Sequence, residues 1–334
     1  MSVKTKIACI FLMAAIAGSA MAGGRGDGRT IMRVGDVWSV AHPNSRSIHE
    51  IFKPMVEQGT GGAIYVEIYN SGALGHEQTL WDSVRNGIVE MVIVGSALAT
   101  EYGPLLISDW PLLYRDVDHA RNVWTGTFAE DFKTSFNARF PTMTMLGIGP
   151  NSARTFTSNR PLRNFDDFSG QRIRMPANPI HTGIATDLGA SAQIIPLTDL
   201  FSAMQTGVVD GQDNGMVTVL SERFHEVQRY LFETNHMIAI MHTVINRQFL
   251  NSLSPEHQQV IRNAAREASI WAWNEYLLSL DTDRQTLRDL GVTVSPLTPS
   301  DRDRMLQAIQ PTLTRLHAEN PWARETIERV GNVQ

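Results

Sequence analysis

A single stretch, residues 255–290, constrains the fold of this chain more than any other feature. Apolar residues recur in it at helical spacing without a break, Ser254 is a typical helix N-cap, and Gly291 is a typical stop. Pro255 and Glu256 suit the first helical turn. At 1.5 Å per residue the helix would extend roughly 54 Å, which is longer than one domain of ordinary size is wide. We therefore expect this helix to span two lobes.

The length of the chain and a repeated short pattern also indicate two lobes. A chain of 334 residues with 43% hydrophobic and 19% charged residues is an ordinary globular protein of about two domains. Residues 85–90 read Arg-Asn-Gly-Ile-Val-Glu, and residues 205–210 read Gln-Thr-Gly-Val-Val-Asp. In each, a helix ends at the glycine and a short apolar strand follows, over 88–94 and 208–210. We interpret this echo as two α/β lobes built on related plans.

The first 22 residues predict export. Lys4 and Lys6 precede an apolar run over 7–17 and small residues near Ala22, which is the pattern of a cleavable secretory signal peptide. A membrane anchor is the alternative, but the run is shorter than the roughly 20 residues that a span needs. The only cysteine, Cys9, lies in this segment, so the mature chain is expected to carry no thiol, disulfide or iron–sulfur chemistry.

The charge of the mature chain argues against two classes of partner. Removing two lysines and no acids takes the formal net charge from −5 to −7. A net acidic exported protein is a poor candidate for binding nucleic acid or an anionic membrane surface. No later segment is apolar and long enough to predict direct membrane insertion.

Sequence motifs for catalysis are incomplete or missing. Residues 147–152 begin like a dinucleotide-binding loop but lack its last glycine, and neither a phosphate loop nor a G-x-S-x-G elbow occurs. Three His-Glu pairs begin like a zinc-protease helix without its second histidine: His49-Glu50, His76-Glu77 and His225-Glu226. We therefore expect no enzyme, no cofactor and no metal site.

The stretch 154–214 holds the candidate site. Arg154, Arg174 and Asn214 follow or end short apolar strands, at places where ligands usually bind in α/β proteins. A guanidinium offers a planar fork that binds a carboxylate through two parallel hydrogen bonds. The alternative for Arg174 is a surface ion pair with Asp166 or Asp167. We interpret the stretch as a binding cleft for an anion.

Seven short pieces, taken in their order and spacing, resemble the substrate-binding proteins of tripartite ATP-independent periplasmic (TRAP) transporters, of the dicarboxylate-binding type. The resemblance covers nearly the whole mature chain and rests on residues 69–75, 87–91, 109–116, 157–161, 170–176, 188–190 and 209–214. It implies an α/β, bilobed, periplasmic-binding-protein-like fold joined by hinge strands near Arg154 and Met237. Lobe I would comprise 23–152 and 238–280, and lobe II 153–237 and 281–334.

The resemblance also implies the function. Such a protein resides in the periplasm, closes on a small organic acid, and delivers it to a TRAP-type membrane permease for ion-driven uptake, without catalysis. Two other classes remain open: a sensory module that presents its closed form to a receptor, and, less expected, a secreted enzyme. Sugar acids, hydroxy or keto acids and aromatic acids all carry the carboxylate that an arginine would bind.

Three residue roles follow from the resemblance. Arg174 would make the paired contact to the ligand carboxylate, Arg154 would add a second positive contact near the hinge, and Asn214 would donate a hydrogen bond to the carboxylate. The family often has Glu-Asn-Pro where this chain has Asp213-Asn214-Gly215. We expect the loss of that proline to soften the following turn.

Further cleft candidates come from position alone. Leu197 occupies the place of an aromatic residue in sialic-acid binders, and Gly95 replaces an acid of those binders. Four other side chains lie on loops that would face the gap: Trp38, His42, Glu77 and His242. Trp38 could equally be a core residue, and Glu77 could simply stabilise the N-terminus of its helix. A cleft with so few polar partners would suit a smaller or more apolar acid than sialic acid.

Overall fold

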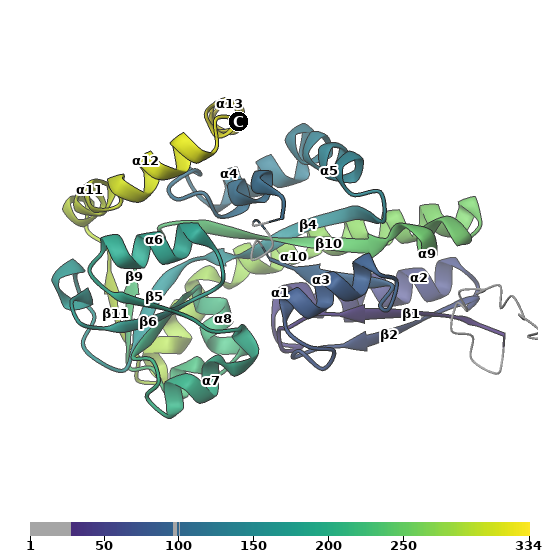
Figure 1. The fold of residues 1–334 in the computed structure, drawn as a ribbon. Helices are drawn as coiled ribbons and strands as arrows, with labels where there is room; N and C mark the ends of the chain where they lie inside the picture. The colour runs from purple at the N-terminus through teal and green to yellow at the C-terminus, as the bar shows by residue number, and fades with distance from the viewer. Residues whose placement is uncertain (1–27, 96–98, 100) are drawn as a thin grey trace, which may run out of the picture.

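The fold has two β-sheets, each with its own helices, joined by extended strands (Figure 1). The computed structural model describes residues 28–95, 99 and 101–334, so the predicted signal peptide lies outside the described residues. Within the part of the chain that is described, no helix is long and apolar enough to cross a membrane. The predicted bilobed α/β fold is confirmed.

Lobe I is built on a five-stranded sheet in the order β2-β1-β3-β10-β4. Strand β1 pairs in parallel with β2 and β3, whereas β10 is antiparallel to β3 and β4. The strands are β1 (Thr30–Gly35), β2 (Ile64–Tyr69), β3 (Met91–Val94), β4 (Met143–Ala153) and β10 (Ile238–Asn246). The helices between them are α1 (Pro43–Ser47), η1 (Ile48–Phe52), α2 (Lys53–Gly59), α3 (Glu77–Arg85), η3 (Gly103–Asp109), α4 (Val117–Thr125), α5 (Thr127–Arg139) and, after β10, α9 (Arg247–Ser252).

Lobe II is built on a six-stranded sheet in the order β11-β9-β5-β8-β6-β7. Its strands are β5 (Thr155–Ser158), β6 (Arg172–Met175), β7 (Ser191–Ile194), β8 (Gly211–Asn214), β9 (Tyr230–Glu233) and β11 (Thr293–Pro296). Its helices are η4 (Phe165–Phe168), α6 (Pro179–Asp187), α7 (Leu197–Gln205), α8 (Met216–Ser221) and η5 (Phe224–Glu226). The exact residues at which one lobe gives way to the other stay a prediction.

The expected strand over 208–210 is wrong, because these residues complete the end of helix α7. The amides of Val208 and Val209 donate to the carbonyl oxygen of Ala203, after Gly207 has turned the chain with a φ of 72°. A left-handed glycine with such backward hydrogen bonds is a common helix stop. Strand β8 therefore begins three residues later than expected, and β3 likewise begins at Met91 rather than at residue 88.

The similar segments 85–90 and 205–210 each end in an acid that binds an arginine in the same way. At Glu90 the carboxylate accepts from the backbone amide and the guanidinium of Arg33, at 2.7 to 2.9 Å. Asp210 accepts from the backbone amide and the guanidinium of Arg172 in the same way, at 2.8 to 3.2 Å. In each lobe an acid after a helix-ending glycine therefore binds an arginine of a neighbouring strand. The two lobes share a local plan, as the sequence echo predicted.

Two extended connections join the lobes. Strand β4 runs into β5 through Arg154, and β9 leads to β10 through residues 234–237. The connections are hydrogen-bonded to each other, since the amide of Arg154 donates to the carbonyl oxygen of Met237 at 2.8 Å. Beside them, the amide of Ala153 donates to the hydroxyl oxygen of Tyr276 at 2.5 Å. These are the hinge strands that the sequence predicted.

The long helix is present and spans both lobes. Helix α10 (Pro255–Asp289) has 35 residues and a length of about 52 Å at 1.5 Å per residue. It packs against α1, α2 and β4 in lobe I and against α8 and β11 in lobe II. The last helices, α11 (Pro299–Ala308), α12 (Gln310–Glu319) and α13 (Ala323–Gly331), lie along the top of Figure 1, where α12 packs on α6 and α13 on η3. The end of the chain thus also contacts both lobes.

Candidate ligand-binding cleft

A small cavity of about 40 Å³ lies between the lobes. Lobe II contributes Arg154, Arg174, Pro176, Leu197 and Asn214. Lobe I, including its strand β10, contributes Trp38, Glu77, Gly95, Asp109, Asn151, Ile240 and Met241. Six of the eight predicted site residues therefore surround one cavity. A second cavity of about 160 Å³ shares Glu77, Arg174, Pro176 and Leu197 with it and continues past Ile194. Together they form the cleft.

Larger hollows occur elsewhere, but several arginines that line them are bound to other groups of the chain. One of about 440 Å³ lies beside the hinge, and another of about 540 Å³ lies near Arg247. In the first, Arg284 is paired with Glu233 at 2.6 Å, and Arg115 donates to two carbonyl oxygens of the C-terminal segment. Arg247 donates to backbone carbonyl oxygens at its own hollow. The interlobe cleft is therefore the better candidate for binding an anion.

Arg174 presents its guanidinium to the cleft. Its side chain comes from the end of β6, is 4% exposed, and donates from Nε to the carbonyl oxygen of Ile195 at 2.6 Å. Burial and the charge of Arg154 lower the pKa of Arg174 to about 10. The group stays charged at neutral pH, but burial in the cleft disfavours that charge.

The alternative surface ion pair for Arg174 is wrong. Asp166 is paired with Arg304 at 3.0 Å, and Asp167 accepts from the backbone amide of Arg163 at 2.8 Å. Arg174 points away from both, into the cleft.

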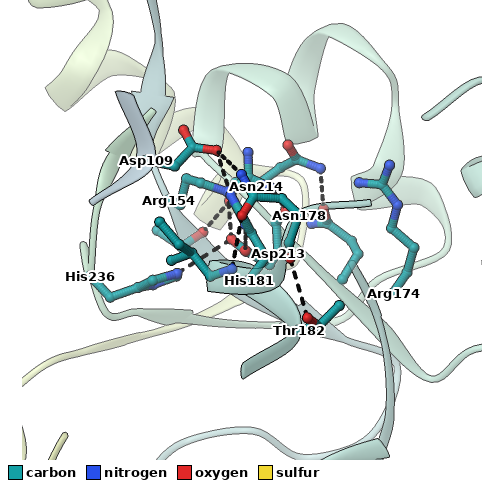
Figure 2. A network of polar contacts seen from close by, with 12 residues as sticks. Asp109, Arg154, Arg174, Asn178, His181, Thr182, Asp213, Asn214 and His236 are labelled. Carbon is teal, nitrogen blue, oxygen red and sulfur yellow. Dashed lines mark hydrogen bonds and ion pairs between the residues drawn. The ribbon is translucent and has the colours of Figure 1, made fainter. Parts of the chain in front are cut away.

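Arg154 is held by its own counter-ion. Its Nε donates to a carboxylate oxygen of Asp213 at 2.8 Å, and a second guanidinium nitrogen donates to the backbone carbonyl oxygen of Asp213 (Figure 2). Burial alone would raise the pKa of Asp213, but the charge of Arg154 and the neighbouring histidines hold it well below its ordinary value. Arg154 is therefore fixed and electrically compensated before any ligand arrives.

His181 connects this pair to the other lobe. Its Nδ1 lies 2.8 Å from a carboxylate oxygen of Asp213, and its Nε2 lies 2.6 Å from a carboxylate oxygen of Asp109 (Figure 2). Burial opposes a charge on this imidazole, but the two carboxylates outweigh burial and raise the pKa of His181. Behind Asp213, His236 stacks on Phe156 with ring centroids 4.7 Å apart, and burial lowers the pKa of His236.

Sequence reasoning missed Asp109, Asn151, His181 and His236. The partners of His181 are 32 and 72 residues away along the chain, so no local spacing reveals them. One sequence signal was available, since His181 lies in the first turn of a helix that Asn178 caps directly after the motif containing Arg174.

Asn214 lines the cavity at the end of β8. Its side-chain amide donates to the side-chain oxygen of Gln212 at 2.6 Å. The residue after it is glycine because space is short: a Cβ at Gly215 would lie 2.1 Å from the Cβ of Ser152. The amide of Gly215 also donates to the hydroxyl of Ser152 at 3.1 Å, a bond that proline could not make. The turn is thus closely packed rather than softened.

Glu77 reaches the cavity from the first turn of α3. One of its carboxylate oxygens accepts from the amide of Gly95 at 2.6 Å. A Cβ at Gly95 would lie only 3.0 Å from that oxygen, so glycine at this position leaves room for the carboxyl group. Burial raises the pKa of Glu77, although the Gly95 amide and Arg174 oppose the shift. Glu77 therefore does more than stabilise a helix end.

Two predicted candidates do not line the cavity. His42 caps helix α1, accepting from the amide of Asn44, and its ring lies 5.6 Å from that of Trp38. His242 lies on β10 and is hydrogen-bonded to Ser108 at 3.0 Å. Burial lowers the pKa of His42 to about 3 and that of His242 to about 4, so both are neutral at neutral pH. Met241, next to His242 on β10, and Trp38, whose ring lies beside His42, line the cavity instead.

Trp38 serves both core and cleft. It is 3% exposed, its amide donates to Asp36 at 3.1 Å, and its side chain lines the cavity. The loop that carries it also touches lobe II, since the amide and hydroxyl of Ser39 donate to Glu222 and to the carbonyl oxygen of Ser221, both at 2.9 Å. With the contact between His181 and Asp109, these bonds show that the lobes are closed on each other.

Two lobes that close by hinge strands over a buried, arginine-lined cleft define a solute-binding protein. Residues 34–320 match the model of bacterial extracellular solute-binding protein family 7, and the chain belongs to this family. The family comprises binding proteins for transport rather than enzymes, which confirms the predicted class.

Several relatives are named for the acids that they bind. The chain is 26% identical to the 2,3-diketo-L-gulonate-binding periplasmic protein of Escherichia coli, with 85% of this chain and 86% of that protein covered. It is 26% identical to the C4-dicarboxylate-binding periplasmic protein of Rhodobacter capsulatus, with 84% and 81% covered. The structure of a sugar-acid-binding protein of Advenella mimigardefordensis in complex with galactonate is similar, with 25% identity, a TM-score of 0.85, and 90% and 96% covered.

Proposed function

We propose that this protein captures a hydroxylated monocarboxylic acid of about sugar-acid size and delivers it to a TRAP-type membrane permease. The observation that carries the proposal is the arrangement of charge in the cleft. Arg174 and Arg154 stand on the lobe II wall with Asn214, and Glu77 and Asp109 stand opposite.

The ligand carboxylate docks on Arg174. Arg154 is already paired with Asp213, whereas Arg174 uses its Nε on a backbone carbonyl and keeps its terminal nitrogens toward the cleft. A carboxylate there replaces lost water with charge-assisted hydrogen bonds. Its charge also removes the penalty of burying an arginine that forms no ion pair with a described residue. Asn214 lies beside this position and would add a contact to the same carboxylate.

The opposite wall selects the rest of the ligand. Glu77, Asp109 and Asn151 line this wall, and carboxylate and amide oxygens accept hydrogen bonds, which suits hydroxyl groups. A second carboxylate in the same place would face like charge, which costs free energy in a buried site. The wall is more polar than the sequence indicated, so we favour sugar acids over small apolar acids and C4-dicarboxylates. The relatives named for diketogulonate and galactonate agree with this choice, whereas the relative named for C4-dicarboxylates does not.

Export and delivery complete the proposal. Residues 1–22 act as a cleavable signal peptide that takes the protein to the periplasm, and the closed form docks on the permease. Uptake of labelled acid into proteoliposomes that hold a TRAP-type permease should then require this protein.

A thermal-shift screen with three matched acids tests the ligand class. Galactonate has one carboxylate and hydroxyl groups, galactarate has the same carbon chain with a second carboxylate, and hexanoate has no hydroxyl group. We expect galactonate to stabilise the protein most, since a ligand at about 100 times its Kd adds roughly 2.7 kcal/mol. Stronger stabilisation by galactarate or hexanoate would contradict the role proposed for the wall formed by Glu77, Asp109 and Asn151. Stabilisation by uncharged sugars alone would contradict the role of Arg174.

A further inference from the structure

We infer that His181 is a positioning residue whose imidazolium ties the two lobes together in the closed form, so that capture of the acid weakens as pH rises. This inference rests on the proposed function, because it concerns the closure of the same cleft. It adds a residue that is not among those lining the cavity.

The contact geometry requires a doubly protonated ring. His181 is buried, and each ring nitrogen faces a carboxylate oxygen, at 2.8 Å for Asp213 and at 2.6 Å for Asp109. Ionised carboxylates only accept hydrogen bonds, so both ring nitrogens must donate. The neutral ring carries a single N–H and would leave one of these contacts as a repulsion between two acceptors. The bridge is therefore complete only in the cationic form of His181.

The bridge crosses from one lobe to the other. His181 lies on α6, which packs on β6 and β7, and Asp213 lies on β8 of the same sheet. Asp109 ends η3, which packs on β10 of lobe I. Opening the hinge would separate Asp109 from His181 while leaving the contact to Asp213 intact. The closed form thus binds the proton of His181 more tightly than an open form does.

The same bridge also positions Arg154. Asp213 accepts from Arg154 with one carboxylate oxygen and faces His181 with the other. Protonated His181 therefore fixes the rotamer of Asp213, and through it the guanidinium of Arg154 (Figure 2). Loss of the proton would loosen both the interlobe contact and this support.

The sign of the pH effect follows from proton linkage. The carboxylates raise the pKa of His181 above its ordinary value of 6.5, despite burial. Closure is therefore fully supported below the pKa of His181 in the open form and loses support as pH rises through its raised pKa in the closed form. If one proton binds to the closed form alone, the Kd increases at most about tenfold per pH unit in that window.

Other charged groups surround His181 on every side. Asp109, Asp213, Arg154 and His236 face it most closely, Arg174 and Glu77 stand further along the cleft, and helix α12, packed on α6, brings Arg315 and His317. Glu77 lines the cleft, and Glu222 accepts from Ser39 across it. Burial raises the pKa of both carboxyl groups. The difference between the wild type and a His181 variant therefore isolates the contribution of this imidazole.

The test measures affinity for galactonate by calorimetry from pH 5.5 to 9 for the wild type, His181→Gln, Asp109→Asn and His119→Gln. His119 is a matched control, since it is buried but is hydrogen-bonded to Val330 and Arg115 away from the cleft. We expect wild type and His119→Gln to weaken with rising pH. His181→Gln should be about 30-fold weaker or more at pH 5.5, a typical loss for one partner of a buried charge pair, and nearly independent of pH. Asp109→Asn, which keeps His181 and Asp213, should lose most of the slope.

A second measurement needs no acid and so separates this inference from the proposed function. Cysteines at Gln58 on α2 and Ser202 on α7, both exposed, would carry spin labels on a mature chain that holds no other cysteine. We expect the ligand-free wild type to shift toward shorter interlobe distances as pH falls, and His181→Gln to shift less. The inference would be overturned if the affinity and the interlobe distance each depended on pH to the same extent in the wild type and in His181→Gln, even if galactonate bound well.

Discussion

Replacing Arg174 by methionine should stabilise the empty protein and weaken ligand binding. The pKa of Arg174 falls from 12.5 to about 10, and each unit corresponds to about 1.4 kcal/mol, so the closed, empty cleft disfavours its charge by roughly 3 kcal/mol. Methionine fills similar space without charge, but the hydrogen bond to Ile195, worth about 1 kcal/mol, is lost. We expect a net gain of up to about 2 kcal/mol in the closed form.

Binding should change in the opposite direction. Truncating one partner of a buried charge pair typically costs about 2 to 5 kcal/mol, which weakens affinity for galactonate by about 30-fold to several thousandfold. Arg174→Lys should also bind poorly, because an ammonium group cannot make two parallel hydrogen bonds to a carboxylate. The control is Arg304→Met, which removes an exposed arginine paired with exposed Asp166 and should change stability by less than about 1 kcal/mol.

Two assays test the predicted gain in stability and the predicted loss of affinity. Urea denaturation without ligand measures the free energy of unfolding, and calorimetry measures the affinity. If Arg174→Met lowered the unfolding free energy and kept the affinity of the wild type, Arg174 would be a structural residue. The account of the cleft would then be wrong.

Two further predictions concern the walls of the cleft. Glu77→Gln keeps the oxygen that accepts from Gly95 and removes the negative charge, so the preference for galactonate over galactarate should shrink by about tenfold in competitive binding. Unchanged discrimination would show that Glu77 does not face the second carboxylate. Gly215→Ala places a Cβ against Ser152 and should lower the unfolding free energy by about 1 to 3 kcal/mol in urea titrations, whereas Gly331→Ala, with nothing within 4 Å, should be near neutral; equal effects would refute the packing argument.

The sequence predicted those features that depend on local pattern. The helical period over 255–290 and its caps define α10 to within a residue, and its length alone required two lobes. Residues at the ends of short strands, such as Arg174 and Asn214, could be assigned to one cleft because ligands of α/β proteins bind where strands end.

Features that depend on contacts between distant segments could not be predicted. The buried bridge of Asp109, His181 and Asp213 joins three elements of two lobes, and nothing in the spacing of these residues indicates it. His42 and His242 were both expected in the cleft from a loop position, but His42 caps helix α1, and His242 lies within strand β10 and is hydrogen-bonded to Ser108. The direction in which such a side chain points depends on its packing against other segments, which local sequence pattern does not reveal.

The charges in the closed cleft explain why binding an anion would balance them. Arg154 is balanced by Asp213, and His181 in its cationic form is balanced by Asp109. Arg174 forms no ion pair with a described residue; Glu77 lies nearby, but its carboxylate accepts from the amide of Gly95. Closing the empty lobes therefore buries a positive charge at a cost, whereas closing them on a carboxylate does not. Because a ligand can drive closure only by binding the closed form better, the same unbalanced arginine would select an acid and favour closure around it.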